Sequence, residues 1–462
     1  MFKKNVKYAI GAQGIQLFRS VLMSLLIPRI LGMESFGYWQ LFIFYNQFGI
    51  ILTMGLIDGL YIKCGGKNYE DLDFYSIGFQ FKLLFIIQIF LFLILCFFLN
   101  TMSSERRFII LMCCISIIVS NLSSFLGFIL QAVSQMKHYA LGRFVSGLSF
   151  VWILLIFIVT TMNNFKAYII VFILCQLVEC FIYCRYNKKI LVAAFYSKNN
   201  KKNVLDFFSN IKIGINILLS TFVGLFILGI GRYVIDERWG VIEFAKVSFF
   251  LTFSSFFMSF VTQASYAFLP ELVKEKEDNI GAMFLKVKSI IQLISPVILL
   301  FYLPICIFVK YLLPKYYGSV NYLIILLPIC MFDSKMQFLF VTYFKKQRKE
   351  RSLLLCNICS FILATIFVCI SAYIMKSTYA VVASMLIAII FRSILAEKML
   401  IPTIKLYHYK LYKSVLPEIL VVTVFVLLNF GFNKLIAAFM FAVAISFYFL
   451  FYRIHIKQIL IK

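Results

Sequence analysis

Charged residues are scarce in this chain, and their scarcity excludes most soluble architectures. Of the 462 residues, 14% are charged and 63% are hydrophobic, whereas soluble domains carry about 25% charged and about 45–50% apolar residues. The mean hydropathy is +0.95. Because almost nothing separates the apolar stretches, no room is left for a separate soluble domain, and the chain is expected to act within a bilayer.

Histidine is nearly absent, which counts against a metal site built on imidazole. The three histidines, His138, His408 and His455, fall in predicted loops or tails. The twelve cysteines lie mostly in apolar stretches, where thiols pack as small hydrophobic groups. Cys356 and Cys359 form a C-x-x-C, but no second pair completes a zinc site. We therefore expect no metal ion and no cofactor.

Acidic residues are outnumbered by basic ones, 19 to 45, which gives a formal net charge of +26. In a soluble protein this excess would indicate nucleic acid. Here the basic residues cluster in alternate loops, as they do in the cytoplasmic loops of membrane proteins. The pattern predicts a multi-pass protein with both termini in the cytoplasm and no nucleic-acid partner. A smaller share of the charge is available for an anionic substrate.

Long apolar stretches are what the chain has in abundance. A helix needs about 20 apolar residues to span the hydrocarbon core, so the sequence predicts an all-α polytopic membrane protein with about 14 transmembrane helices. Pro296 and Pro304 in span nine and Pro328 in span ten predict kinks. The expected spans are 8–31, 38–62, 76–99, 108–132, 140–161, 166–184, 211–235, 241–267, 287–309, 319–344, 353–375, 378–400, 415–432 and 435–452.

The longest connection, residues 185–210, is basic and has one apolar face. An interfacial helix on anionic lipid and a solvated linker are both open for it. It predicts an N-terminal six-helix lobe (1–184), a cytoplasmic linker, a C-terminal six-helix lobe (211–400), and two last helices with a cytoplasmic tail (401–462). Transporters often place the substrate site between two such halves.

A few ionisable residues fall inside the spans, where an unpaired charge is costly. Arg19, Asp333 and Lys335 lie too deep to reach the interface. Asp333 and Lys335 are two residues apart and point to different sides of a helix, so at least one should meet another helix or a cavity. An ion pair between helices is the structural alternative. Glu179 and Arg392 lie nearer the span ends and are expected to extend to the interface.

The deep charges are mainly cationic, which predicts a cavity for an anionic solute or a lipid phosphate. Deep acids are essentially Asp58 and Asp333, which become the candidates for coupling to an ion. Amides in the spans could bind sugars, but they also join helices as polar contacts. The candidate cavity residues are Arg19, Lys335, Lys246, Arg232, Asp333 and Gln16.

The segment from Pro28 to Gly32, followed by Phe36 and Gly37, resembles the P-x-x-L-G-x-x-x-[FY]-G signature of the MOP (multidrug/oligosaccharidyl-lipid/polysaccharide) flippase superfamily. The likeness is strongest to Wzx-type exporters of O-antigen and related polysaccharide units. Gly231 stands where the family usually has Asp, which weakens an acidic role there. Similar motifs follow in the family's order at Gly55–Gly59, Arg232–Ile235, Phe244–Ala245, Phe268–Pro270 and Leu313–Tyr317.

The resemblance implies two six-helix lobes around a central cavity, with the last two helices peripheral. It implies a flippase, not an enzyme, that moves a polyprenyl-diphosphate-linked oligosaccharide across the bacterial cytoplasmic (inner) membrane. Alternating access would be coupled to H⁺ or Na⁺. The implied partners are the lipid-linked oligosaccharide, membrane lipids and the polysaccharide polymerase machinery.

Two other functions stay open. A multidrug-type cation antiporter of the same superfamily would favour deep acids, of which the sequence indicates few. A membrane enzyme of polysaccharide assembly would need a sizeable outer loop or a His/Asp pair near a membrane face, and the predicted outer loops are short.

Overall fold

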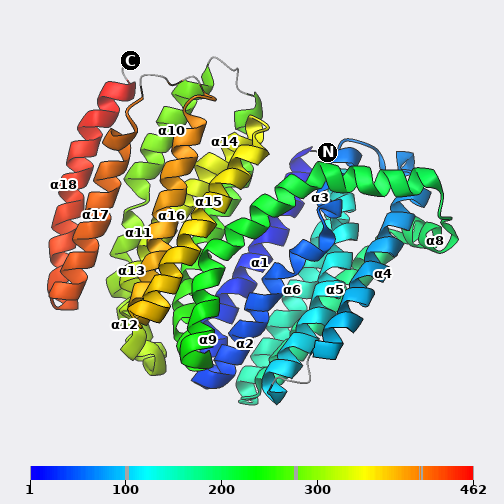
Figure 1. Cartoon of the computed structure of the whole chain (residues 1–462), viewed down its shortest axis with the longest axis horizontal. Coiled ribbons are helices and arrows are strands. Elements are labelled where there is room, and N and C mark those ends of the chain that lie inside the picture. The colour runs from blue at the N-terminus through cyan, green and yellow to red at the C-terminus, as the bar shows by residue number, and fades with distance from the viewer. Residues whose placement is uncertain (1, 99–102, 275–278, 405, 407–408, 461–462) are drawn as a thin grey trace. The chain divides into compact units, whose positions relative to one another are not determined.

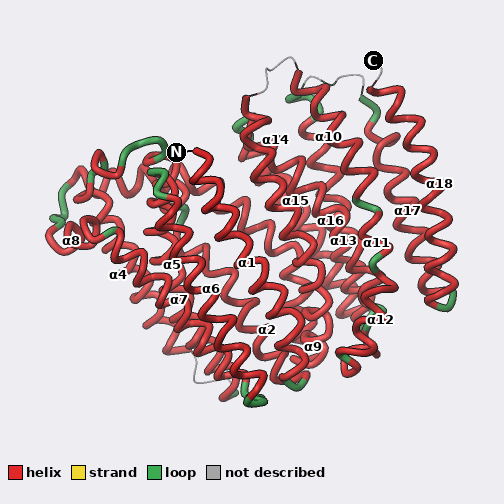
Figure 2. The backbone as a smooth tube through the Cα atoms, turned by 180° about the vertical axis from the view of Figure 1, so that it is seen from behind, coloured by secondary structure: helices red, strands yellow, loops and turns green. Residues whose placement is uncertain are grey.

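The computed structural model describes residues 2–98, 103–274, 279–404, 406 and 409–460. Every regular element in these ranges is a helix (Figure 2). Ten of the described helices are long and apolar enough to cross a membrane, or up to eleven if a bent pair is one span. The predicted all-α polytopic class is confirmed.

The chain divides into two compact units, residues 1–222 and 223–462. Each is a helix bundle (Figure 1). The first unit contains α1 (Phe2–Ile30), α2 (Met33–Gln47), α3 (Leu56–Cys64), α4 (Phe74–Phe98), α5 (Ser104–Ala132), α6 (Met136–Val159), α7 (Phe165–Tyr186), α8 (Lys188–Tyr196) and the first part of α9 (Lys201–Lys274).

Predicted span two is bent, because Met33–Thr53, which is α2 followed by a 3₁₀ helix, meets α3 at 59°. The bend follows from positive φ at Met54 (52°) and Gly55 (80°), a backbone conformation that glycine adopts without strain. A Cβ on Gly59 would lie 1.9 Å from the carbonyl oxygen of Asn210, and one on Gly214 would lie 2.0 Å from that of Gly55. The glycines of this motif therefore let the backbones of α3 and α9 touch.

The predicted 185–210 connection is largely helical. It contains α8 and the start of α9, and α8 packs on α4 where Gly78 meets the backbone of Ala194. Phe195 and Tyr196 are 85% and 73% exposed at the end of α8. Whether this surface rests on lipid stays a prediction.

The second unit contains the rest of α9 and nine further α-helices. Predicted spans seven and eight both fall in α9, which breaks at Gly240 (φ 79°). The other helices are α10 (Ile280–Ile294), α11 (Val297–Leu300), α12 (Tyr302–Leu312), α13 (Tyr322–Lys335), α14 (Val341–Lys346), α15 (Glu350–Cys369), α16 (Thr378–Leu400), α17 (Leu411–Gly431) and α18 (Lys434–Leu460).

Proline acts differently in the two predicted places. Span nine is broken into α10, α11 and α12, with Pro296 at the N-cap of α11 and Pro304 in the first turn of α12. Pro328 instead lies inside a continuous α13. The irregularity of span ten comes later, in a π-helical turn at Met336–Phe340 directly after Lys335. Such turns are frequent at functional sites.

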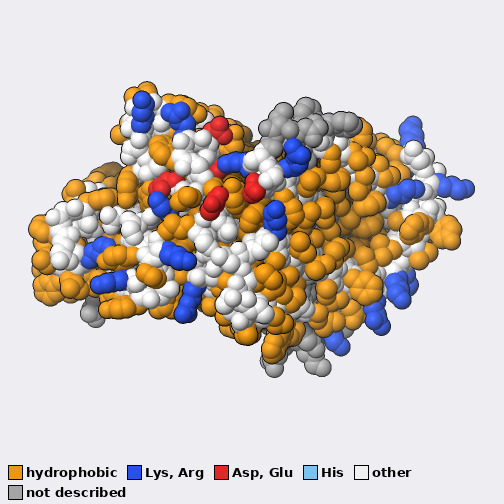
Figure 3. Space-filling view, turned by 90° about the horizontal axis from the view of Figure 1, so that it is seen from below, with side chains coloured by type: hydrophobic (Ala, Val, Ile, Leu, Met, Phe, Trp, Pro, Cys, Tyr) orange, Lys and Arg blue, Asp and Glu red, His pale blue; other side chains and the backbone are white. Residues whose placement is uncertain are grey.

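The outer surface is rich in large apolar side chains, including Trp152, Phe181 and Phe439 (61–72% exposed), and Figure 3 shows broad hydrophobic areas between scattered charges. Such a surface suits lipid rather than water. Burial is very uneven between helices. In α13–α14, 78% of the most apolar window is buried, against 22% in α4. Helix α13 is thus the central helix of its unit, and it carries Asp333 and Lys335.

Candidate functional site

The first unit contains a charge cluster between α6 and α7. Tyr139 and Arg143 are one helical turn apart on α6, and Glu179 and Tyr183 are one turn apart on α7, so each pair shares a face. Arg143 Nε lies 3.5 Å from Glu179 Oε1 and donates to the Tyr139 hydroxyl at 3.3 Å. Tyr183 donates to the Tyr139 carbonyl at 2.9 Å. The Arg143 side chain is still 38% exposed and Glu179 is 12% exposed.

Arg19 of α1 adds a second cation to this unit. Its guanidinium lies 5.8 Å from the ring centre of Phe150 on α6 and 5.6 Å from that of Phe172 on α7. Within the described chain, no carboxylate lies within 4.0 Å of it. Glu179 is bonded to Arg143 instead. Where the three helices meet, Arg19 and Arg143 therefore face one glutamate, Glu179, which leaves an excess of positive charge.

Gln16, one turn before Arg19 on α1, donates to the carbonyl of Arg143 at 3.2 Å. It lies at the contact of α1 with α6, where Gly147 leaves room for it. This amide therefore fixes α1 against α6 in the way expected of polar contacts between membrane helices.

In the second unit the deep arginine is paired. Arg392 of α16 donates to Asp333 of α13 at 3.2 Å and to Asn357 of α15 at 2.8 Å. A Cβ on Gly224 of α9 would lie 3.2 Å from its guanidinium. Arg392 is 5% exposed, so the expectation that it extends to the interface is wrong. A carboxylate, an amide and a small neighbour satisfy it inside the bundle.

Lys335 belongs to a second buried network. Its Nζ lies 2.5 Å from Glu418 Oε2 of α17 and 3.9 Å from Glu397 Oε2 of α16. Lys288 of α10 donates to Glu397 Oε1 and to the hydroxyl of Tyr409, which itself donates to Glu397 Oε1 at 2.7 Å. The four charged side chains are 0–3% exposed. As predicted, Asp333 and Lys335 diverge: Asp333 pairs with Arg392 of α16, whereas Lys335 lies closest to Glu418 of α17.

The remaining candidates lie apart from this network. Arg232 donates to the Ser248 hydroxyl at 3.1 Å and lies over the Phe244 ring at 5.1 Å. Lys246 pairs with Glu243, three residues earlier, at 2.8 Å. Asp58 is half-buried in the first turn of α3.

Sequence reasoning missed four of the buried or half-buried charges. Glu397, Glu418 and Lys288 fall near the ends of their predicted spans, where a charge is usually solvated, and Arg143 lies just inside a span. The expectation that deep acids are essentially Asp58 and Asp333 is wrong, because Glu397 and Glu418 are at most 1% exposed. The available signal was the position of Glu397 and Glu418 inside the predicted spans 378–400 and 415–432.

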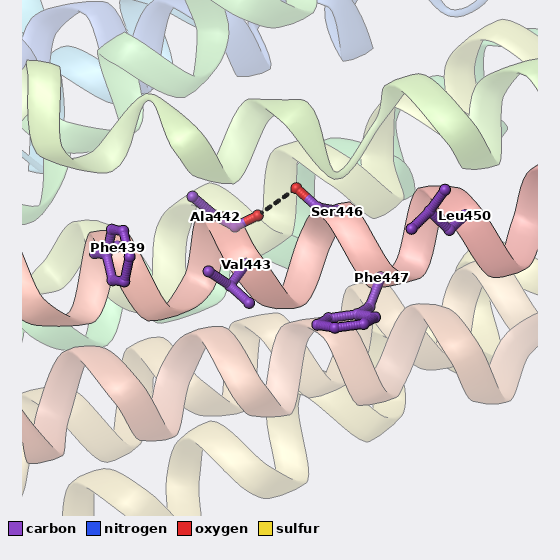
Figure 4. A pocket seen from close by; sticks show the side chains of 6 residues that line it. All are labelled: Phe439, Ala442, Val443, Ser446, Phe447 and Leu450. Carbon is purple, nitrogen blue, oxygen red and sulfur yellow. Dashed lines mark hydrogen bonds between the residues drawn. The ribbon is translucent and has the colours of Figure 1, made fainter.

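The cavity drawn in Figure 4 is apolar. Its one hydroxyl, Ser446, already donates to the Ala442 carbonyl at 2.8 Å. It offers no group for a charged substrate. Elsewhere in the described part of the chain, no group of three or more His, Cys, Asp or Glu could hold a metal ion. The cavity is lined from α18 alone by Phe439, Ala442, Val443, Ser446, Phe447 and Leu450.

No protein-family model matches the sequence, and no protein of curated function matches it. Solved structures do match its fold. An inward-facing multidrug resistance MATE family transporter of the MOP superfamily is 14% identical, covering 85% of this chain and 96% of its own, with a TM-score of 0.66.

Two further structures agree. The lipid II flippase MurJ in an inward closed conformation is 14% identical, with 99% of this chain and 100% of its own covered and a TM-score of 0.59. A eukaryotic MATE transporter is 12% identical, with 91% and 98% covered and a TM-score of 0.54. The chain therefore has the fold of MOP superfamily transporters.

Proposed function

We propose that this protein is a flippase that moves a polyprenyl-diphosphate-linked oligosaccharide across a bacterial cytoplasmic membrane, in the manner of Wzx-type exporters. The observation that carries the proposal is the unbalanced positive charge where α1, α6 and α7 of the first unit meet. Glu179 pairs with Arg143, and Arg19 has no carboxylate within 4.0 Å among the described residues. Arginine binds phosphate oxygens strongly and in two-pronged geometry. An anionic headgroup would complete the charge balance that the protein leaves open.

The division of labour differs from the sequence prediction. Arg19 keeps its role as a ligand of the diphosphate, and Arg143 joins it. Lys335 is already neutralised by Glu418 at 2.5 Å, so it is better placed to respond to an ion than to hold substrate. The termini lie in the cytoplasm, and polymerase machinery takes up the exported unit.

A cation antiporter of the multidrug type is the second candidate. The acids Asp333, Glu397 and Glu418 in the second unit favour it, because carboxylates bind cationic solutes. Each lies beside a lysine or arginine of the same unit, however, and its charge is already balanced. Drug susceptibility that follows the expression level would support this candidate.

The test is the sidedness of the lipid-linked oligosaccharide in membrane vesicles prepared with and without the protein. Loss of the protein should trap the glycan on the cytoplasmic leaflet. Arg19→Gln should do the same at normal protein level, and Arg19→Lys should restore part of the export. Lys166→Gln is the matched control, because Lys166, at the start of α7, also lies over an aromatic ring, that of Phe108 on α5.

Two results would contradict the proposal. If vesicles that lack the protein carry unpolymerised glycan on the outer leaflet, the defect lies after flipping. That result would support an enzyme of polysaccharide assembly. Normal export by Arg19→Gln would show that Arg19 does not bind the substrate. Whether the protein transports the glycan would then be decided by comparing vesicles with and without the protein.

A further inference from the structure

The network of Lys288, Glu397, Lys335 and Glu418 has a cost that packing alone does not explain. Four charged side chains from α10, α16, α13 and α17 meet with exposures of 0–3%. Well-packed apolar side chains usually hold helices at least as firmly as buried ion pairs do. The four groups are balanced, two positive and two negative, so they also offer no net charge to a substrate.

The network is incompletely bonded, and the gaps lie on the carboxylates. Glu397 Oε1 accepts from both Lys288 and Tyr409, while Glu397 Oε2 is buried and has no hydrogen-bond partner among the described residues. Glu418 Oε2 accepts from Lys335, while Glu418 Oε1 is buried and has none in the same described part of the chain. A buried acceptor without a donor is unfavourable, because it has lost its bond to water. Each acid thus presents one oxygen that can take up a proton.

A metal cation fits this site poorly, because the Lys335 ammonium already lies beside both carboxylates. It is 2.5 Å from Glu418 Oε2 and 3.9 Å from Glu397 Oε2, and the rings of Phe332 and Phe340 lie within 5.7 Å. Hard metal ions need several oxygen ligands around one centre. A proton adds directly to one oxygen and needs no such space.

We propose that this network is the proton-binding site that couples the transport function proposed above to a pH gradient. The proton adds to Glu418 Oε1, and the carboxylate becomes a neutral acid. The total charge of the four groups rises from zero to +1. Lys335, released from Glu418, moves the short distance to Glu397 Oε2, and the tie between α13 and α17 is lost. Loss of the proton restores the tie.

Tyr409 is the entry to the site. It is half-buried on the segment just before α17, and its hydroxyl bonds both Lys288 and Glu397. A hydroxyl that donates and accepts can pass a proton to Glu397. The Lys335 ammonium, 3.9 Å from Glu397 Oε2 and 2.5 Å from Glu418 Oε2, relays it by releasing one proton to Glu418 and taking one up from Glu397. By the charge pattern of the loops, this segment faces the cytoplasm.

The other titratable groups near the network are already bonded among the residues that the structure describes. Tyr448 of α18 donates to the carbonyl of Gln292 at 3.0 Å, and Gln292 lies one helical turn after Lys288 on α10. Asp333 and Arg392, on the same two central helices, pair with each other. None of these three residues is bonded to Glu397 Oε2 or Glu418 Oε1.

The first experiment records pH-difference infrared spectra of the purified full-length protein in lipid nanodiscs. Wild type should show the carbonyl band of a protonated carboxylic acid as the pH falls. Glu418→Gln should lose it. Because that variant leaves Lys335 unpaired and could misfold, the double variant Lys335→Gln/Glu418→Gln, which is neutral and similar in shape, should lose the band as well. Glu70→Gln is the control, because Glu70 pairs with Lys189 at an exposed site.

The second experiment measures flipping of lipid-linked oligosaccharide in proteoliposomes with an imposed pH gradient. The gradient should accelerate wild type, and the double variant should lose that acceleration while still flipping substrate down its own gradient. An unchanged infrared band in both Glu418 variants and in Glu397→Gln would overturn the site. So would loss of the band in Asp333→Asn with the network variants unaffected. If no variant moves this substrate, the proposed function fails while the infrared result still decides the proton site.

Discussion

The two units treat buried charge in opposite ways. In the first, Glu179 pairs with Arg143, and Arg19 lies over aromatic rings with no carboxylate of the described chain within salt-bridge distance. In the second, every cation of the central cluster has an acid on another helix, as in Lys335 with Glu418 and Arg392 with Asp333. An unbalanced site is suited to a charged ligand, whereas a balanced one is suited to a switch that a single proton can tip.

The units also differ in how their helices approach one another. The first unit brings backbones together at glycines, with Gly59 against Asn210 and Gly78 against Ala194. Its tyrosine Tyr183 fits between Gly127 and Gly142. The second unit surrounds the almost wholly buried α13 with ionic and amide contacts. A substitution at a close backbone contact introduces a steric clash, whereas a substitution in a buried ion pair leaves an unpaired charge. Substitutions in the two units should therefore have different effects on stability.

The largest effect is expected for breaking one half of a balanced pair. Lys335→Met should lower the free energy of unfolding by about 3–5 kcal/mol, because it leaves the Glu418 carboxylate buried without its cation. Lys335→Met/Glu418→Leu should recover most of that loss. Thermal unfolding in detergent measures both. If the single and double variants unfold with the same loss of free energy, the two side chains contribute to stability through packing and not through their charges.

The next effect separates function from stability in the unbalanced site. Arg19→Gln should reduce flipping about 10- to 100-fold, the equivalent of one charge-assisted hydrogen bond of about 1.5–3 kcal/mol. Its unfolding should change by less than about 1 kcal/mol, since Arg19 contributes ring contacts but no salt bridge. Transport in proteoliposomes and thermal unfolding of the same preparation are compared. A large loss of stability would show that Arg19 is structural.

A somewhat smaller effect is expected at the glycine contacts. Gly59→Ala should destabilise the first unit by about 1–3 kcal/mol, because the new methyl group would meet the backbone of Asn210 at 1.9 Å. Gly318→Ala is the matched control in the second unit, since nothing lies within 4 Å of its Cβ position. Thermal unfolding of the two variants should differ clearly. Similar midpoints would mean that α3 and α9 can separate without cost.

The smallest effect is expected for an exposed ion pair. The hydrogen bond from Lys202 holds the pKa of the Asp73 carboxyl below its ordinary value of 3.8. Because the folded pKa is depressed, the contribution of this carboxylate is present above the unfolded pKa and is lost as the pH falls through the folded one. Asp73→Asn should therefore leave unfolding at neutral pH nearly unchanged, since solvent screens the pair. Unfolding midpoints at neutral and acidic pH check this.

Sequence reasoning succeeded where the signal is local. Apolar length located spans, whereas the bend at Gly55 lies in a motif that was selected only for its resemblance to a family. The prediction from sequence was wrong for Arg392, which was expected at the membrane interface. It also missed the buried Glu397 and Glu418. Depth along a span was a poor guide there, because a residue near a helix end is buried whenever neighbouring helices extend past it.

The sequence by itself determined the class of this protein, because a bilayer accepts only backbones that satisfy their own hydrogen bonds and apolar runs of helical length do so locally. It also placed some charges, such as Arg19 and Lys335, well inside the spans. Only the tertiary structure decided what those charges do. Partners such as Lys335 and Glu418 are far apart in the chain and meet through helix packing, and no local pattern specifies which faces pack.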